Sequence, residues 1–139
     1  MSERLGGRVL VAGRARGRVL RLDAPLSFWG GFDPVRGVVL DRHHPQAGAA
    51  LAGRVVVMPE SRGSAGTPAA IAEAIRRGTA PAAFLLAAAD VNIATGALVA
   101  AELYGTAVPV LALDAGVHAR LPEGALVAID EDGRIEVAG

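Results

Sequence analysis

The segment with the clearest capacity for chemistry is residues 59–68, which reads PESRGSAGTP. Ser64 follows Arg62 by two residues. A serine hydroxyl is normally a very weak acid, but surrounding N–H donors and a guanidinium stabilise its alkoxide. Arg62 also offers the forked donor geometry that a planar carboxylate prefers. These residues predict a site where Ser64 accepts a proton from a carbon atom next to a carboxylate.

Helix capping is the alternative role for the hydroxyl groups of this segment. Ser and Thr are common at helix starts and in tight turns. Gly63 and Gly66 permit a positive φ and the close approach of a ligand, but they also suit an ordinary turn. The segment lacks the Gly-Lys-Ser/Thr ending of a phosphate-binding P-loop. Residue types alone leave both interpretations open.

Residues 25–34 form a second unusual segment, because three of the few aromatic rings surround a Gly-Gly pair there. The rings are Phe28, Trp29 and Phe32. Such a pattern is consistent with a lid, a pocket wall or a docking surface, whereas single rings usually serve core packing. We expect exposed apolar surface around Phe28 and Trp29 at an interface.

The histidines and aspartates favour structural roles. His43 and His44 are adjacent and would point to opposite faces of a strand, so a solvated turn is expected for them rather than a shared metal. His118 stands near Asp114, but the sequence order assembles no Ser-His-Asp set. The aspartates expected at turns or helix starts are Asp33, Asp41 and Asp90.

Composition excludes several functions. The chain has no cysteine, so it offers no thiolate ligand for zinc or an iron–sulfur cluster. Fourteen basic residues balance fourteen acidic ones, so the chain has no net charge that would attract it to nucleic acid or to an anionic membrane. The apolar run 80–89 is too short to cross a bilayer. We expect a single domain over residues 1–139 in a cytoplasmic protein, without nucleic-acid or membrane partners.

A β-α-β-α-β unit is predicted to position residues 59–68. Apolar runs at 55–58, 83–87 and 108–113 indicate buried strands, and helical stretches separate them. In open α/β sheets, ligands collect beyond the carboxyl ends of the strands, where helix starts attract anions. The unit therefore presents residues 59–68 where a carboxylate would bind.

Capping signals delimit both helices of this unit. Thr67 is the predicted N-cap of the first helix, Pro68 its first residue and Gly78 its C′ residue. The second helix is expected over about 93–104, with Asp90 or Asn92 as its cap.

The remaining chain is predicted to be β-rich. Residues 9–11 and 17–22 indicate a hairpin or two short strands, and a strand at 38–41 makes the first half antiparallel and turn-rich. Residues 125–129 and 134–137 flank an Asp-Gly pair that is typical of a hairpin.

Taken in order, the motifs of residues 17–113 resemble the swivelling domain of the aconitase X family. Their order and spacing carry the resemblance together. The matching residues are Pro25-Leu26-Ser27-Phe28-Trp29-Gly30-Gly31, Asp33-Pro34, Gly37, His44-Pro45, Gly48, Gly53, Met58-Pro59, Arg62-Gly63-Ser64, Gly78-Thr79-Ala80-Pro81-Ala82-Ala83 and Gly96.

The resemblance implies an α/β fold with a single swivelling β/β/α domain, in which a β-rich, barrel-like part packs with a short parallel βαβαβ part. It also implies a dehydratase small subunit that is inactive without its large subunit. That cysteine-containing partner would hold an iron–sulfur cluster or iron, and no cofactor would be bound by this chain.

By the same resemblance, Ser64 is the proton acceptor, and Arg62 and Gly63 bind the substrate carboxylate or stabilise the alkoxide. The residues expected along the same seam are Ser27, Gly30 and Gly31. Ala65 and Gly66 depart from the family pattern, in which serines often follow the motif. Glu60 and Ser61 also depart from this pattern, because they stand where the family often has small residues before the arginine.

Two substrates are known in the family, cis-3-hydroxy-L-proline and mevalonate 5-phosphate. The residues that favour the first are Trp29, Met58, Thr79 and Tyr104. A non-catalytic anion-binding or scaffolding module is the competing hypothesis from another class. A Ser64→Ala change separates it from catalysis.

Overall fold

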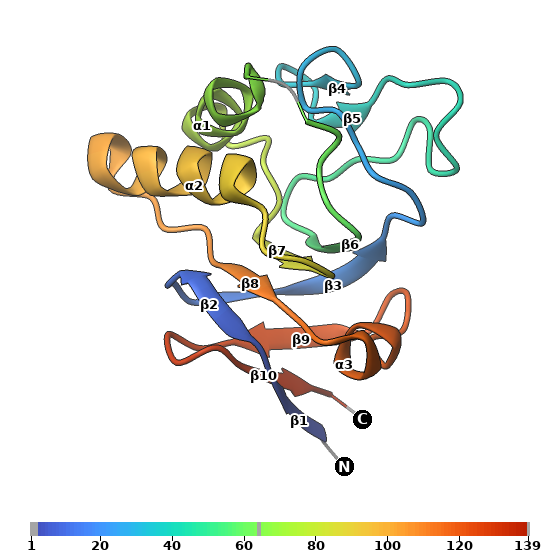
Figure 1. Ribbon diagram of the computed structural model, residues 1–139, viewed down its shortest axis with the longest axis vertical. Coiled ribbons are helices and arrows are strands. Elements are labelled where there is room, and N and C mark those ends of the chain that lie inside the picture. The colour runs from blue at the N-terminus through green and yellow to red at the C-terminus, as the bar shows by residue number, and fades with distance from the viewer. Residues whose placement is uncertain (1–2, 64, 139) are drawn as a thin grey trace.

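Strands and helices alternate along the computed structural model, which describes residues 3–63 and 65–138 (Figure 1). The strands are β1 (Glu3–Gly6), β2 (Arg8–Val11), β3 (Ala15–Arg21), β4 (Phe32–Asp33), β5 (Val38–Val39), β6 (Val55–Met58), β7 (Ala83–Leu86), β8 (Val110–Ala112), β9 (Leu126–Ile129) and β10 (Arg134–Val137). The helices are α1 (Thr67–Arg77), α2 (Val91–Tyr104) and α3 (Ala115–Ala119). Within the described ranges, no helix is both long and apolar enough to cross a membrane.

Eight strands form one sheet in the order β1-β10-β9-β3-β6-β7-β8-β2, and β4 pairs with β5 separately. Strands β3, β6, β7 and β8 run parallel, which confirms the predicted β-α-β-α-β unit. The prediction of an antiparallel first half is wrong for β3 and β6. The long connection over residues 22–54 returns the chain to the end from which β3 started, so β6 pairs with it in parallel.

The sheet closes almost completely on itself, because its two edge strands follow each other in the chain. Only Gly7 separates β1 from β2, and its amide donates to the Gly133 carbonyl over 3.1 Å. Strand β2 pairs with β8, and β3 pairs with β9, so of the two alternatives predicted for this segment the two separate strands are confirmed and the hairpin is wrong. The C-terminal hairpin of β9 and β10 is confirmed. The expected barrel-like part with a parallel βαβαβ part is therefore present.

Alternating side chains bury both faces of the parallel strands. On β6, Val56 and Met58 belong to the cluster under α1 and α2, whereas Val55 and Val57 face the barrel interior. Figure 1 shows the two helices on one side of these strands, with β9, β10 and α3 on the other. This two-sided burial explains why the strands read as continuous apolar runs.

Helix α1 starts differently from the prediction. Its N-cap is Gly66, which already has helical angles (φ −80°, ψ −10°), and Thr67 is the first helical residue. Thr67 is fully buried, and its hydroxyl finds no hydrogen-bond partner within the described part of the chain. The prediction that Gly78 ends this helix is confirmed, because Gly78 adopts the left-handed conformation.

Candidate functional site

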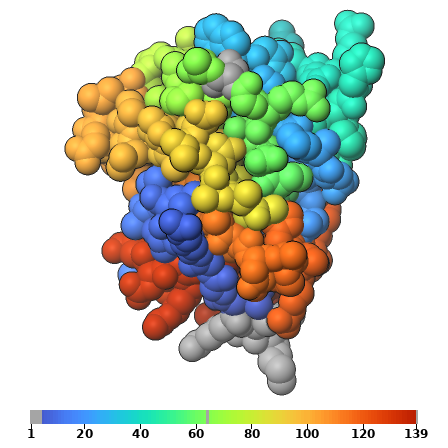
Figure 2. All heavy atoms as spheres, viewed as in Figure 1, coloured from blue at the N-terminus to red at the C-terminus, as the bar shows by residue number. Residues whose placement is uncertain are grey.

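The loop of residues 59–66 follows the carboxyl end of β6 and leads into α1. It borders the start of α2, and Figure 2 shows its green atoms next to the yellow atoms that lead into that helix. An open hollow of about 520 Å³ lies between them. Its lining residues are Pro25, Glu60, Ser61, Arg62, Gly63, Ala89, Asp90, Val91 and Asn92. The predicted location at the carboxyl ends of parallel strands is thereby confirmed.

Ser61 ties the loop to the start of α2. The Ser61 amide and hydroxyl both donate to Oδ2 of Asp90, over 2.7 and 2.6 Å. The other oxygen of Asp90 accepts the amide hydrogen of Ile93 over 3.1 Å and so caps α2. This confirms Asp90 as the cap and adds a contact that sequence reasoning missed.

A second attachment joins the loop to Leu26. The Arg62 amide donates to the Leu26 carbonyl over 2.9 Å, and Leu26 also forms an isolated parallel bridge with Ser61. Leu26 is only 1% exposed, so this anchor belongs to the core. The backbone of Ser61 and Arg62 is thus bonded to two separate segments of the chain.

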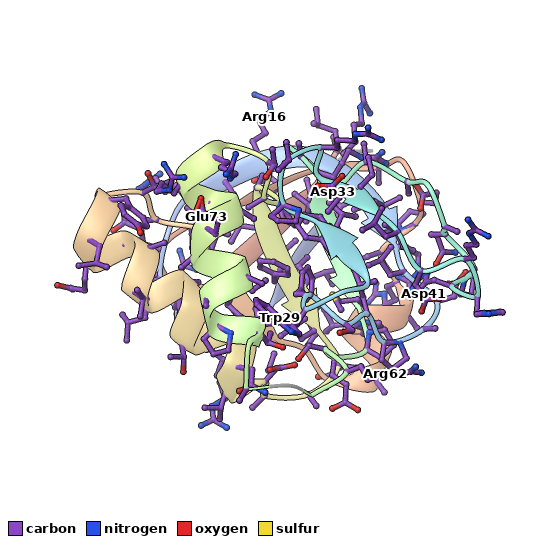
Figure 3. All side chains as sticks on the ribbon, turned by 90° about the horizontal axis from the view of Figure 1, so that it is seen from above. Arg16, Trp29, Asp33, Asp41, Arg62 and Glu73 are labelled. Carbon is purple, nitrogen blue, oxygen red and sulfur yellow. The ribbon has the colours of Figure 1, made fainter. Side chains whose placement is uncertain are left out.

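Arg62 presents a free charge beside the hollow. Its side chain is exposed and forms no hydrogen bond or ion pair with the residues that the structure describes. Figure 3 shows it at the edge of the fold. A guanidinium without an internal partner is available to a carboxylate ligand. Glu60 is also exposed at the rim of the same hollow.

Gly63 and Gly66 do not use the positive φ that their type permits. A Cβ atom on Gly63 would meet nothing within 4 Å, so the space beside it is open. At Gly66 a Cβ atom would come within 2.7 Å of the Trp29 ring. The close approach expected at Gly66 is therefore made by an indole of this chain. Ser64, the predicted base, lies outside the described residues.

Ser27, Gly30 and Gly31 build the turn that carries Trp29. The Ser27 hydroxyl donates to the Trp29 carbonyl over 2.9 Å, and the Gly31 amide donates to the Ser27 carbonyl over 3.1 Å. Gly30 has a φ of 101°, which favours glycine. None of the three is among the residues lining the hollow at Arg62. Gly30 instead lines a separate, more apolar hollow between Trp29 and α1.

The three rings of this segment divide between core and surface. Phe28 and Phe32 are each 2% exposed, and the Phe28 ring centroid lies 5.4 Å from that of Phe32 and 5.8 Å from that of Phe84. Trp29 is 64% exposed beside the start of α1 (Figure 3). The expectation of exposed surface is therefore right for Trp29 and wrong for Phe28, because edge contacts with Phe84 bury that ring.

His44 is buried, not solvated as predicted. Its Nδ1 accepts the Gln46 amide hydrogen over 3.0 Å, so Nε2 carries the ring hydrogen and donates it to the Ala24 carbonyl at 3.0 Å. His118 contacts the Met58 carbonyl at 3.0 Å through Nε2. Both rings are thus engaged with the backbone. Asp33 and Asp41 accept amide hydrogens in turns, as predicted.

The residues that the structure describes do not fit an iron or iron–sulfur centre. The chain has no cysteine. Across residues 3–63 and 65–138, no group of three His, Asp or Glu side chains is arranged to hold a metal ion.

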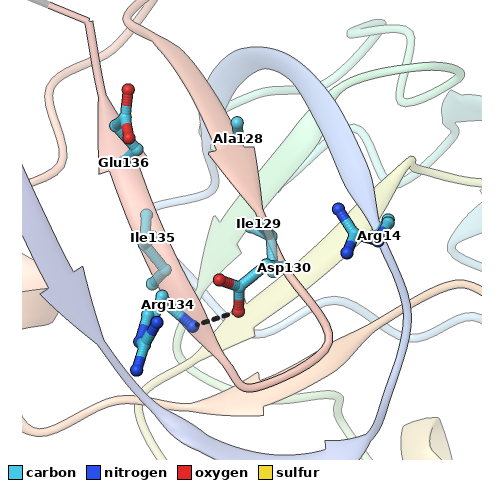
Figure 4. A pocket seen from close by; sticks show the side chains of 7 residues that line it. All are labelled: Arg14, Ala128, Ile129, Asp130, Arg134, Ile135 and Glu136. Carbon is cyan, nitrogen blue, oxygen red and sulfur yellow. Dashed lines mark hydrogen bonds between the residues drawn. The ribbon is translucent and has the colours of Figure 1, made fainter.

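Two other features lie away from the loop. A hollow of about 280 Å³ flanks the β9–β10 hairpin, where Asp130 accepts the Arg134 amide hydrogen and Arg14 lies nearby (Figure 4). On α1, hydrogen bonding to Arg76 is the main cause that lowers the pKa of Glu73 below its usual value, and the charges of Arg76 and Arg77 act in the same direction. The residues named for these two features include none of the described residues of the loop.

Comparisons with known proteins point to one family. The sequence pattern of the family described as "Aconitase X swivel domain" matches residues 4–137. A protein named cis-3-hydroxy-L-proline dehydratase from Pseudomonas aeruginosa is 47% identical over 106 residues, which are 76% of this chain and 18% of that protein. The chain therefore spans less than a fifth of the length of that relative.

Two further similarities cover nearly the whole chain. A protein named phosphomevalonate dehydratase small subunit from Thermococcus onnurineus is 35% identical over 130 residues, which are 92% of this chain and 99% of that one. The crystal structure of Thermococcus kodakaraensis aconitase X in its holo form superposes with a TM-score of 0.87 at 31% identity, covering 99% of both chains.

Proposed function

The chain belongs to the aconitase X swivel-domain family, and from this membership we propose that it is the small subunit of a dehydratase that acts on a small hydroxy carboxylic acid. The observation that carries the proposal is the free Arg62 guanidinium beside an open hollow of about 520 Å³. A ligand carboxylate placed there would meet both Arg62 and the open space at Gly63.

In this proposal Ser64 accepts the proton from the carbon next to the substrate carboxylate. The residue stands between Gly63 and Ala65, in the loop that joins β6 to α1. The first amides of α1 lack intrahelical acceptors, and the N-cap Gly66 offers them no side chain. Their positive potential, together with Arg62, would stabilise the serine alkoxide.

We propose that a large partner subunit promotes the loss of the substrate's β-hydroxyl group. The chain has no cysteine, and its described residues offer no ligand set for iron, so we propose that cysteines of the partner hold the iron–sulfur cluster or iron. The hollow is open on its outer side, as half of a shared site would be. We expect the isolated chain to be inactive.

Exposed apolar side chains on α2 support such a partner. Val91, Leu98 and Leu103 are 75%, 54% and 69% exposed, and α2 carries a single charged residue, Glu102. A helix that is apolar on all sides is usually covered by protein. Val91 also lines the hollow, so the surface continues from the proposed site along the helix.

For the substrate we propose cis-3-hydroxy-L-proline, because the relative that is 47% identical is named after this compound. Among the described residues that line the hollow, Arg62 is the only basic one, which suits one carboxylate better than a carboxylate and a phosphate together. Mevalonate 5-phosphate is the second candidate, because the relative from Thermococcus onnurineus, which is matched over 99% of its length, is named a phosphomevalonate dehydratase small subunit.

The experiment is reconstitution with the cognate large subunit and assay of both substrates. Turnover of cis-3-hydroxy-L-proline should require both chains and should be lost in Ser64→Ala. Thr106→Ala, which deletes an exposed hydroxyl beyond α2, is the matched control and should keep full turnover. Turnover that survives Ser64→Ala would leave a non-catalytic anion-binding or scaffolding module as the better description.

A further inference from the structure

We infer that Asp90 is a positioning residue of this site, which fixes through Ser61 the loop that carries Arg62 and Ser64. The inference rests on the proposed function, because it assigns a part in that reaction to a side chain that does not itself react. Its physical basis is a single carboxylate shared between the start of α2 and the loop.

Both oxygens of Asp90 are engaged. Oδ2 receives two hydrogens from Ser61, at 2.7 and 2.6 Å, and Oδ1 receives one from the Ile93 amide at 3.1 Å. Hydrogen bonds to an ionised acceptor are shorter and stronger than neutral ones. Ser61 is only 8% exposed, so water competes little for its donors. A carboxylate with three donors is held in one orientation.

Capping alone does not need this arrangement. A helix N-cap requires one acceptor for one or two amides of the first turn, and a serine hydroxyl provides it. Asp114 on α3 serves as such a cap: among the described contacts, its carboxylate accepts a hydrogen bond from the Val117 amide alone, through Oδ1 at 2.9 Å. The second oxygen of Asp90 is therefore what distinguishes the two caps, and it points to the loop.

The loop is bracketed on both sides of Ser64 in the chain. On one side Asp90 and the Leu26 carbonyl hold Ser61 and Arg62. On the other side the Trp29 ring lies against Gly66. Without the Asp90 contact, two backbone hydrogen bonds among the described contacts would still hold the loop before Ser64, from the Ala87 amide to the Pro59 carbonyl and from the Arg62 amide to the Leu26 carbonyl, but neither engages the donors of Ser61. A catalytic loop displaced by about 1 Å can lose roughly 100-fold in rate.

The test uses Asp→Ser changes at two caps in the reconstituted two-subunit enzyme. Asp90→Ser keeps a cap for α2 but is too short to reach Ser61, and Asp114→Ser makes the same change on α3. We expect kcat/KM to fall about 10- to 100-fold in Asp90→Ser, with kcat and KM both affected, and to change less than about twofold in Asp114→Ser. Ser61→Ala, which removes the hydroxyl bond alone, should lie between them.

Amide hydrogen exchange provides a readout that is independent of turnover. The Ser61 amide should exchange faster in Asp90→Ser, whereas the Ile93 amide should stay protected by the serine cap. Equal kcat/KM in Asp90→Ser and Asp114→Ser, alongside an inactive Ser64→Ala, would overturn the positioning role and leave the proposed function intact. An active Ser64→Ala would instead overturn the proposed function, and an unchanged Ser61 exchange rate would overturn the contact itself.

Discussion

The Trp29 indole lies so close to Gly66 that a Cβ atom there would approach ring carbon Cδ2 to 2.7 Å. Trp29 comes from the turn after β3, and Gly66 is the last residue before α1. The ring is exposed on its other side. An aromatic side chain thus lies between solvent and the end of the proposed catalytic loop, and its contact with a glycine makes the loop position sensitive to one methyl group.

Gly66→Ala should displace the indole. Alanine suits the helical angles of residue 66, so the steric effect on Trp29 is isolated from backbone strain. Trp29 is the chain's single tryptophan, and its fluorescence should therefore shift and become more accessible to acrylamide. Gly63→Ala, where a Cβ atom meets nothing within 4 Å, is the control. Identical spectra for the two variants would contradict the contact.

Arg62→Ala should raise KM for the carboxylate substrate in the reconstituted enzyme. Loss of a hydrogen bond between charged groups costs about 1.5–3 kcal/mol, which corresponds to roughly 10- to 100-fold in affinity. Arg62→Lys should fall between wild type and alanine, because lysine keeps the charge without the fork. Arg42→Ala, at another exposed arginine, should leave KM unchanged. A KM unaffected by Arg62→Ala would remove Arg62 from the binding site.

Gly96→Ala should destabilise the pairing of α1 with α2. Its Cβ atom would come within 2.7 Å of both the Pro68 carbonyl oxygen and the Ile71 Cβ atom. Overpacking of this kind costs about 1–3 kcal/mol of unfolding free energy. Gly116→Ala on α3 meets its nearest atom at 3.5 Å and should be neutral. Urea unfolding of both variants measures the difference, and equal midpoints would be inconsistent with the close packing.

Glu73→Gln should weaken the pH dependence of stability in acid. Hydrogen bonding to Arg76 lowers the pKa of Glu73 in the folded protein. Ionised Glu73 therefore stabilises the fold above its unfolded-state pKa, and this contribution disappears as the pH falls through the folded-state pKa. The variant should unfold at lower urea than wild type at pH 7, with the gap closing near pH 2. Glu102→Gln on α2 is the control, and a gap that persists in acid would refute the pairing.

Leu98→Asp should weaken association with the large subunit. Leu98 is 54% exposed on α2, so a charge there is tolerated by the isolated fold but not by a covered apolar face. Val35→Asp, at a residue 61% exposed between β4 and β5, is the control. Calorimetric titration of each variant with the large subunit measures the change. Equal affinities would place the partner elsewhere.

Local and periodic features of this protein were predictable from its sequence. The β6-α1-β7-α2-β8 unit follows from apolar runs and helix-end signals, and Gly78 after α1 adopts the expected left-handed conformation. The hairpin of β9 and β10 follows from its Asp-Gly turn. The site loop was located for the same reason, because its place after a buried strand and before a helix is a property of the chain order.

Contacts between distant segments were decided by the tertiary structure. Whether Thr67 or Gly66 caps α1, whether Phe28 is exposed, and which strand pairs with β3 depend on neighbours that the chain order does not specify. The pairing of Ser61 with Asp90 is of this kind: each polar residue had a sufficient local explanation, and only the parallel arrangement of β6 and β7 brings them within 2.6 Å. Hydrogen bonding between side chains is short-ranged, so it is set by the three-dimensional packing of the strands and not by residue type.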